Sequence, residues 1–153
     1  MHRDIKTENV LIRAPTDAKG PPTSVCICDF GFATGTEPNN ECVGSPQYSA
    51  PEIARIGMAQ GRADVPTRGY TEKCDVWSLG VVTYALLSGM LPFDGRTPTD
   101  VFASILRRNI PFQQPIWRDV SDEAKRFILF LLTADPDQRP SARQALGHAW
   151  LVM

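Results

Sequence analysis

The sequence has no apolar run long enough to cross a lipid bilayer, and it has no surplus of either charge. Its longest apolar runs cover residues 81–87, interrupted by Thr83, and residues 127–132, whereas a membrane-spanning helix needs about 20 apolar residues. Sixteen basic residues stand against seventeen acidic ones, so the balance favours neither nucleic acid nor an anionic membrane as the main partner. The first residues are polar, and no secretory signal is visible in them.

The sequence also lacks paired cysteines. Cys26, Cys28, Cys42 and Cys74 do not have the spacing of a zinc site. Cys26 and Cys28 would share one face of a strand, where we expect small buried side chains. Unpaired cysteines favour a reducing compartment. We therefore expect a cytoplasmic location, with the nucleus as the alternative.

The 153 residues that are present suffice for one domain with its own core. Two short strands are predicted over 10–12 and 25–28, joined by a loop over 13–24 that is rich in turn-forming residues. A long loop is expected over 32–49. The remainder has helical patterns, so the predicted fold is mainly α with a short β-hairpin.

One predicted helix, over 72–87, is apolar almost all round, and such a helix must lie in the middle of the fold. Thr71 is a good N-cap for it, and Gly89 would end it. Further helices are predicted over 51–56 and after the start signals Thr97-Pro98, Ser121-Asp122 and Ser141 to Gln144.

The polar residues with the clearest chemistry lie in the first nine positions. Asp4, Lys6 and Asn9 place an acid, a base and a carboxamide in one short stretch. A tight loop would aim the three side chains into one pocket, where they could hold a hydroxyl, a phosphate and a metal ion. The alternative is that they are ordinary turn residues, and that Asp29 merely ends a strand.

Three short motifs occur in a fixed order: His2-Arg3-Asp4 with Lys6 and Asn9, then Asp29-Phe30-Gly31, then Ala50-Pro51-Glu52. Together they resemble the signature set of the eukaryotic protein kinases, namely the catalytic loop (residues 2–9) and the two ends of the activation segment (residues 29–52). Each motif alone is weak, but the three rarely coincide in order and spacing.

The resemblance covers nearly all of residues 1–153. It continues in Asp75 to Gly80, Leu91-Pro92-Phe93, Asp135-Pro136 and Arg139-Pro140. It implies the helical large (C-terminal) lobe of the kinase fold with the small lobe missing, because no Gly-rich phosphate loop and no strand lysine are present. The chain would then be a fragment, or a gene model begun at an internal methionine.

Residues 116–121 and 145–150 are most similar to the calcium- and calmodulin-dependent group of protein kinases. Within that group they are closest to the calcium-dependent protein kinases of plants and protists. No EF-hand loop is present in the chain. A calcium-sensing region would therefore lie downstream in the parent protein.

The resemblance implies a role for each polar residue of the catalytic loop. Asp4 would orient the substrate hydroxyl and accept its proton, and Lys6 would offset phosphate charge and favour serine or threonine over tyrosine. Asn9 and Asp29 would hold the metal ions, and Leu11 would lie beneath the adenine ring. The implied cofactors are ATP and Mg²⁺, and the residues that would bind them are Lys6, Glu8, Asn9, Leu11 and Asp29.

The resemblance also implies a regulatory contact. Glu41 stands three residues before Gly44, where many kinases carry a phosphorylated threonine that pairs with the arginine of the catalytic loop. A fixed carboxylate could pair with Arg3 without phosphorylation; the alternative is a solvated loop glutamate. Our hypothesis is that this kinase does not depend on phosphorylation of its activation segment. Ser45 stands where the family usually has threonine and would keep a hydroxyl near Asp4.

Other residues are implied to be structural. His2 and Phe30 would stack, with Asp75 anchoring the stack from the central helix. Glu52 and Arg139 would form a buried ion pair that ties the activation segment to the lobe.

The sequence indicates only part of the substrate specificity. Glu8 would meet a basic substrate residue, although Ala85 replaces an acidic residue that basophilic relatives often have. Residues 57–69 are predicted to be an exposed insertion unlike the family. The pocket for the residue after the phosphoacceptor would be lined by Cys42, Pro46 and Ser49.

The predicted function is that of a Ser/Thr protein kinase, here as a fragment that would bind ATP poorly and transfer phosphate negligibly by itself. Its partners would be protein substrates and the missing small lobe. The alternative is a non-catalytic kinase-lobe fragment that acts as a binding or regulatory module. A small-molecule phosphotransferase is disfavoured, because it would not need the peptide-positioning segment over 43–52.

Overall fold

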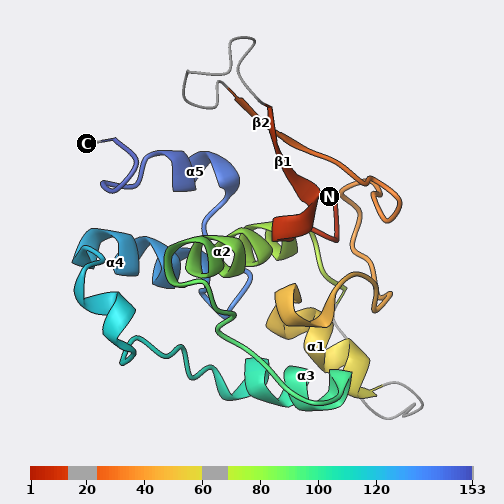
Figure 1. The fold of residues 1–153 in the computed structure, drawn as a ribbon. Helices are drawn as coiled ribbons and strands as arrows, with labels where there is room; N and C mark the ends of the chain where they lie inside the picture. The colour runs from red at the N-terminus through yellow and green to blue at the C-terminus, as the bar shows by residue number, and fades with distance from the viewer. Residues whose placement is uncertain (14–23, 60–68, 153) are drawn as a thin grey trace.

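A computed structural model describes residues 1–13, 24–59 and 69–152 of the chain. Helix α2 (Lys73–Ser88) runs through its middle, with α1 (Pro51–Ala59) and α3 (Pro98–Arg107) on one side of it and α5 (Ala142–Leu146) on the other (Figure 1). Helix α4 (Asp122–Leu131) packs against both α2 and α5. The predicted mainly α fold with a short hairpin is confirmed.

Helix α2 is central because most of its side chains are apolar and packed. Trp77, Val81 and Tyr84 are fully buried, and the absence of a side chain at Gly80 lets Leu131 and Leu132 approach the helix closely. The predicted position of this helix in the middle of the fold is confirmed (Figure 1), although Leu86 near its end is 71% exposed.

The start of α2 also differs from the prediction. The N-cap is Glu72, and its side chain makes no capping hydrogen bond. Thr71 contributes only its carbonyl oxygen, which accepts a hydrogen bond from Cys74 N. At the other end Gly89 adopts the left-handed conformation, as predicted, because a residue without Cβ reaches it without strain.

The other predicted helix starts are confirmed. Thr97 and Ser141 each form a capping box, and Ser121 accepts a hydrogen bond from Ala124 N. Helix α1 continues to Ala59, beyond its predicted end, so positions 57–59 of the predicted insertion are helical. The rest of that predicted insertion, 60–68, lies outside the described residues.

The strands β1 (Val10–Arg13) and β2 (Ser24–Ile27) pair antiparallel, with Val10 opposite Ile27. The prediction that Cys26 and Cys28 are buried was wrong: Cys26 is exposed, and Cys28 follows the end of β2 and is half-buried. The hairpin projects away from the helices, so nothing described covers its outer positions (Figure 1). The predicted loop between the strands lies mostly outside the described residues.

The long loop predicted over 32–49 contains more structure than expected. A 3-10 helix, η2 (Pro46–Tyr48), ends it, and Asn39 pairs with Tyr70 through both backbone groups. Two further 3-10 helices are η1 (Thr7–Asn9) in the catalytic loop and η3 (Pro115–Arg118) after α3. The backbone pairing of Asn39 with Tyr70 fixes the segment 32–49, which has no regular period of its own.

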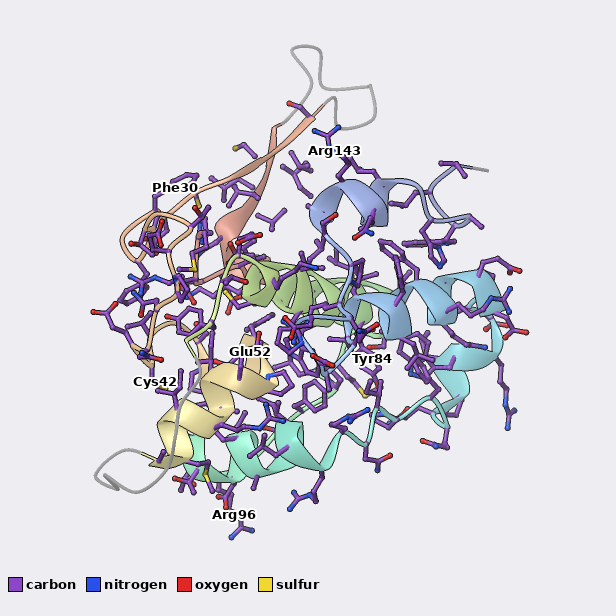
Figure 2. The ribbon with its side chains drawn as sticks, turned by 180° about the vertical axis from the view of Figure 1, so that it is seen from behind. Phe30, Cys42, Glu52, Tyr84, Arg96 and Arg143 are labelled. Atoms are coloured by element: carbon purple, nitrogen blue, oxygen red, sulfur yellow. The ribbon has the colours of Figure 1, made fainter. Side chains whose placement is uncertain are left out.

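The main core lies between α1, α2 and α3 and is rich in aromatic side chains. Trp77 stacks on Phe93 at 5.7 Å between ring centroids, and Tyr84 meets Trp117 at 4.7 Å. Figure 2 shows Glu52 and Tyr84 in the interior among the helices, and Arg96 at the outer edge. Among the helices in the described part of the chain, none has both the length and the hydropathy for a membrane crossing.

Candidate active site

The catalytic loop is fixed to the central helix through its backbone. Asp75, in the first turn of α2, accepts hydrogen bonds from His2 N at 2.7 Å and from Arg3 N at 2.8 Å. Arg3 has a φ of 71°, a left-handed conformation that a residue with a side chain adopts at a cost. The Asp75 carboxylate stabilises this turn, and the turn directs the side chains that follow it.

The predicted stack of His2 and Phe30 is present in the structure. Their ring centroids are 4.8 Å apart, and His2 Nε2 lies 3.1 Å from the carbonyl oxygen of Cys28. His2 is buried, whereas Phe30 is 63% exposed. Phe30 lies toward the edge of the molecule (Figure 2).

Asp4, Lys6 and Ser45 form one hydrogen-bonded cluster. The Lys6 ammonium donates to Asp4 Oδ2 at 2.8 Å and to Ser45 Oγ at 3.0 Å, and Ser45 N donates to Asp4 Oδ1 at 2.9 Å. Asn9 Nδ2 donates to the Asp4 carbonyl oxygen at 2.9 Å. Asp4 and Asn9 are buried, so the cluster holds its geometry away from bulk water.

The cluster keeps Asp4 ionised. Burial alone would raise the pKa of its carboxyl, but the hydrogen bonds from Lys6 and Ser45 outweigh burial and hold the pKa below its ordinary value. The hydrogen bond to Asp4 in turn raises the pKa of the Lys6 ammonium. A buried, ionised carboxylate beside a cation and a hydroxyl can orient a second hydroxyl and accept its proton.

The predicted metal ligands, Asn9 and Asp29, flank the β-hairpin in the chain and lie at its open end, where Cys28 N donates to the Asn9 carbonyl oxygen at 3.0 Å. Asn9 uses its Nδ2 to donate to Asp4, which leaves Oδ1 for a cation. Asp29 is exposed, has a φ of 63°, and accepts a hydrogen bond from Gly31 N at 3.3 Å. No hydrogen bond joins the side chains of Asn9 and Asp29 within the described residues.

These donors fit magnesium, which prefers oxygen ligands and is commonly held by one or two carboxylates together with substrate phosphates. Within residues 1–13, 24–59 and 69–152, no group of three or more His, Cys, Asp or Glu side chains is placed to hold a metal. A magnesium ion held by Asn9 and Asp29 would take its further ligands from phosphate oxygens and water. Leu11, predicted beneath the adenine ring, is 48% exposed at the same end of the molecule.

Arg3 connects the catalytic loop to the activation segment. Its Nη1 lies 2.6 Å from Glu41 Oε2 and 3.3 Å from the Tyr70 hydroxyl, and its Nε donates to the Phe32 carbonyl oxygen at 2.5 Å. The hydrogen bond from Arg3 lowers the pKa of Glu41. Burial opposes the charge on Arg3, but its hydrogen bonds to Glu41 and Tyr70 outweigh burial, so the pKa of Arg3 is raised.

The segment that would position a peptide lies against the catalytic loop. Gly44 has a φ of 88°, and a Cβ there would lie 2.3 Å from the Arg3 carbonyl oxygen. Only glycine therefore permits this approach. Ser49 donates to the Ser45 carbonyl oxygen at 3.3 Å. Cys42 is half-buried beside α1, and burial raises the pKa of its thiol.

Glu52 and Arg139 form a buried ion pair with two hydrogen bonds, of 2.7 and 2.9 Å. Arg139 is 1% exposed and also donates to the carbonyl oxygens of Lys73 and Thr133 at 2.8 Å each. Its guanidinium lies 5.3 Å from the centroid of the Trp77 ring. The pair joins the end of the activation segment to the central helix.

Three residues of this region were missed by reasoning from the sequence. Thr7 Oγ1 lies 2.9 Å from the Tyr48 hydroxyl and donates to Glu8 Oε2 at 2.8 Å. Tyr70 contacts Arg3 from the connection before α2. The sequence has no pattern from which contacts between single hydroxyl groups in distant segments could be predicted. It shows only that Thr7 is a polar residue next to Glu8.

Comparison with known proteins gives a consistent result. A family model described as "Protein kinase domain" matches residues 1–151. A "CDPK-related protein kinase" from Daucus carota is 38% identical over 154 residues, which cover 99% of this chain and 23% of that protein. "Serine/threonine-protein kinase H1" from Homo sapiens is 38% identical and covers 99% of this chain and 33% of that protein.

A third relative comes from another lineage. A "Probable myosin light chain kinase" from Dictyostelium discoideum is 38% identical over 155 residues, covering 99% of this chain and 46% of that protein. The chain thus spans less than half of the length of each of these relatives.

Proposed function

The chain belongs to the protein kinase family, and from that premise we propose that the protein transfers the γ-phosphate of ATP to serine and threonine hydroxyls of protein substrates. The observation that carries this proposal is the cluster of Asp4, Lys6 and Ser45, in which a buried carboxylate stays ionised beside a cation. Because the relatives are longer than the chain, the activity of the whole protein is a proposal.

In this mechanism, Asp4 orients the substrate hydroxyl and takes its proton as the oxygen bonds to the γ-phosphorus, and the bond from that phosphorus to the bridging oxygen breaks so that ADP leaves. Lys6 neutralises negative charge next to that hydroxyl, where its position 2.8 Å from Asp4 and 3.0 Å from Ser45 holds it. Bound ATP and Mg²⁺ supply the transferable phosphoryl group and offset its charge. Asn9 and Asp29 are the residues that would hold the metal, and Leu11 would contact the adenine.

We also propose that the protein belongs to the calcium- and calmodulin-dependent group of protein kinases. The matched relatives include a CDPK-related protein kinase as well as a serine/threonine-protein kinase with no calcium term in its name. Regulation by a calcium-sensing region elsewhere in the parent protein is part of this proposal. It predicts that calcium changes the activity of the parent protein and leaves the isolated 153 residues unaffected.

The proposed activity is tested by transfer of radiolabelled phosphate from ATP to a degenerate Ser/Thr peptide mixture. The chain is assayed alone and joined to any coding sequence found in frame before Met1. We expect transfer in the longer protein and its loss in Asp4→Asn, with full activity in Asp122→Asn, which changes an exposed acid of α4. Transfer that survives Asp4→Asn would contradict the proposal.

A second candidate function is a non-catalytic module that binds peptides. It is favoured by one observation, that Leu11, which would face the adenine ring of a nucleotide, is 48% exposed. A site that leaves so much of its ligand uncovered binds weakly. Peptide binding without phosphate transfer in both forms of the protein would support this second function.

A further inference from the structure

The ion pair of Arg3 and Glu41 receives a second contact on each side from one backbone bridge. The bridge joins Asn39 to Tyr70: Asn39 N donates to the Tyr70 carbonyl oxygen at 3.0 Å, and Tyr70 N donates to the Asn39 carbonyl oxygen at 2.8 Å. The Tyr70 hydroxyl accepts a hydrogen bond from Arg3 Nη1 at 3.3 Å. The Asn39 side chain accepts one from Glu41 N at 2.7 Å and donates to Glu41 Oε2 at 3.4 Å. The bridge therefore supports both partners of the pair.

Both sides of the ion pair are attached to the start of α2. Arg3 is attached through its backbone N, which donates to the carboxylate of Asp75 at 2.8 Å in the first turn of the helix. Glu41 is attached through Asn39 to Tyr70, which lies in the connection that leads into the helix. Arg3 and Glu41 stand 38 positions apart in the chain. The central helix thus positions two distant segments relative to each other.

The Tyr70 hydroxyl is not required for packing. The side chain is 2% exposed and belongs to the main core, where a phenyl ring would fill nearly the same space. A buried hydroxyl without a partner is costly, and in the described structure the Arg3 guanidinium serves as its partner. Burial raises the pKa of Tyr70, although Arg3 opposes this rise. The hydroxyl therefore stays neutral, and it orients Arg3 without cancelling the charge that attracts Glu41.

An ion pair with one exposed partner needs such support if it is to hold a segment in place. The side chain of Glu41 is 62% exposed and that of Arg3 is 8% exposed. An exposed ion pair contributes little by itself, because ordering two long side chains offsets much of the attraction. Contacts that already order both side chains reduce this loss, since less rotamer freedom remains to be lost.

We propose that Asn39 and Tyr70 are positioning residues, which hold Arg3 and Glu41 in register so that the activation segment stays docked on the catalytic loop. The inference rests on the proposed function, because the docked segment leads into the hydrogen-bonded cluster of the candidate active site. Asn39 and Tyr70 act through the ion pair and have no part in the chemical step. The ion pair in turn keeps the segment beside the place where a substrate hydroxyl would lie.

The test is NMR titration of the Glu41 carboxyl carbon in the 153-residue chain, together with hydrogen exchange of its backbone amide. Tyr70→Phe and Asn39→Ala should each move the titration midpoint upward, toward the ordinary value for glutamate, because the hydrogen bonds that favour the ionised carboxylate become weaker. Each variant should also accelerate exchange of the Glu41 amide about two- to fivefold, as for the loss of one hydrogen bond. A merely structural role of the two residues would leave the midpoint unchanged.

Matched variants separate positioning from stability. Tyr84→Phe removes another buried tyrosine hydroxyl, which donates to a backbone carbonyl oxygen in the loop after α3, and it should leave the Glu41 midpoint unchanged. Asn39→Ser, whose hydroxyl can accept the same amide hydrogen, should restore slow exchange. In the Glu41→Gln background, Tyr70→Phe should cause no further acceleration of exchange. Circular dichroism over the same pH range shows where each variant is folded, and only shifts in that range are compared.

An unchanged midpoint in Tyr70→Phe or in Asn39→Ala would overturn the inference, as would a further effect of Tyr70→Phe in the Glu41→Gln background. None of these results depends on phosphate transfer, so the proposed function would stand. Phosphate transfer that survives Asp4→Asn, with the midpoint shifted as expected, would contradict the proposed function and leave the positioning intact. If Asn39→Ala does not fold, Tyr70→Phe, which keeps its ring in the core, decides by the same outcomes.

Discussion

Glu41 accepts a 2.6 Å hydrogen bond from the guanidinium of Arg3, and this ion pair connects the activation segment to the catalytic loop. Asn39 supports the arrangement, because its Oδ1 accepts a hydrogen bond from Glu41 N at 2.7 Å and its backbone pairs with Tyr70. Our hypothesis is that this carboxylate replaces a phosphate in holding the two segments together.

The first prediction concerns phosphorylation. If the Arg3–Glu41 pair replaces a phosphate, phosphatase treatment should leave the activity of the parent kinase unchanged, whereas Glu41→Gln should reduce activity. In Glu41→Gln, hydrogen exchange of the amides over 39–45 should accelerate about two- to fivefold, as for the loss of an exposed ion pair. Glu37→Gln, in the same exposed segment, is the matched control. Activity that phosphatase abolishes and Glu41→Gln does not alter would show the hypothesis to be wrong.

The second prediction gives the pH dependence of this pair. Because the pKa of Glu41 is lower in the folded chain than in the unfolded one, its contribution to stability is fully present above the ordinary glutamate pKa of about 4.3. It is lost as pH falls through the lower, folded-state pKa. NMR titration of the Glu41 carboxyl carbon should show a midpoint below the ordinary value. High salt should shift it back, because Glu41 is exposed, and an unshifted midpoint would contradict the pairing.

The third prediction concerns the approach of Gly44 to the catalytic loop. Gly44→Ala should cost about 1–2 kcal/mol for its left-handed backbone alone, and more because the new Cβ would meet the Arg3 carbonyl oxygen at 2.3 Å. The activation segment should therefore move away from Asp4, and peptide binding should weaken. Gly35→Ala is the control, since a Cβ there meets nothing within 4 Å. Equal effects of both variants on peptide binding and urea unfolding would refute this account.

The fourth prediction concerns the buried ion pair. Arg139→Met leaves the Glu52 carboxylate buried without its partner, which should lower the free energy of unfolding by about 3–5 kcal/mol. The double variant Glu52→Gln, Arg139→Met should be more stable than the single one, because no unpaired charge remains. Arg126→Met, which removes an exposed partner of Glu123, should cost less than about 1 kcal/mol. Urea unfolding measures all three.

Local features of the fold could be predicted from the sequence because their causes lie within a few residues. Thr97, Ser121 and Ser141 cap their helices through contacts three residues away, and Gly89 ends α2 by its own conformational freedom. The prediction about burial that was wrong concerns how the rest of the fold covers a strand. Cys26 matched the pattern of a buried strand, but the hairpin projects from the helices, so Cys26 is exposed.

The candidate site was predictable in its chemistry but not in its contacts. The order of the motifs identified Asp4, Lys6 and Asn9, and the family resemblance supplied the pairs of Arg3 with Glu41 and of Glu52 with Arg139. Nothing in the residues themselves pointed to the contact of Tyr48 with Thr7, or to Tyr70 beside Arg3. Tyr48 is 41 residues away from Thr7 in the chain, and no local pattern spans that separation.

The sequence by itself determined which chemical groups are available and where helices begin, since both depend on residue type and on neighbours in the chain. The tertiary structure decided which groups meet: Asp75 reaches His2 across 73 positions, and Arg139 reaches Glu52 across 87. A hydrogen bond requires an approach of about 3 Å. Approaches that close between distant segments are set by how the helices pack around α2, and this packing is a property of the whole chain.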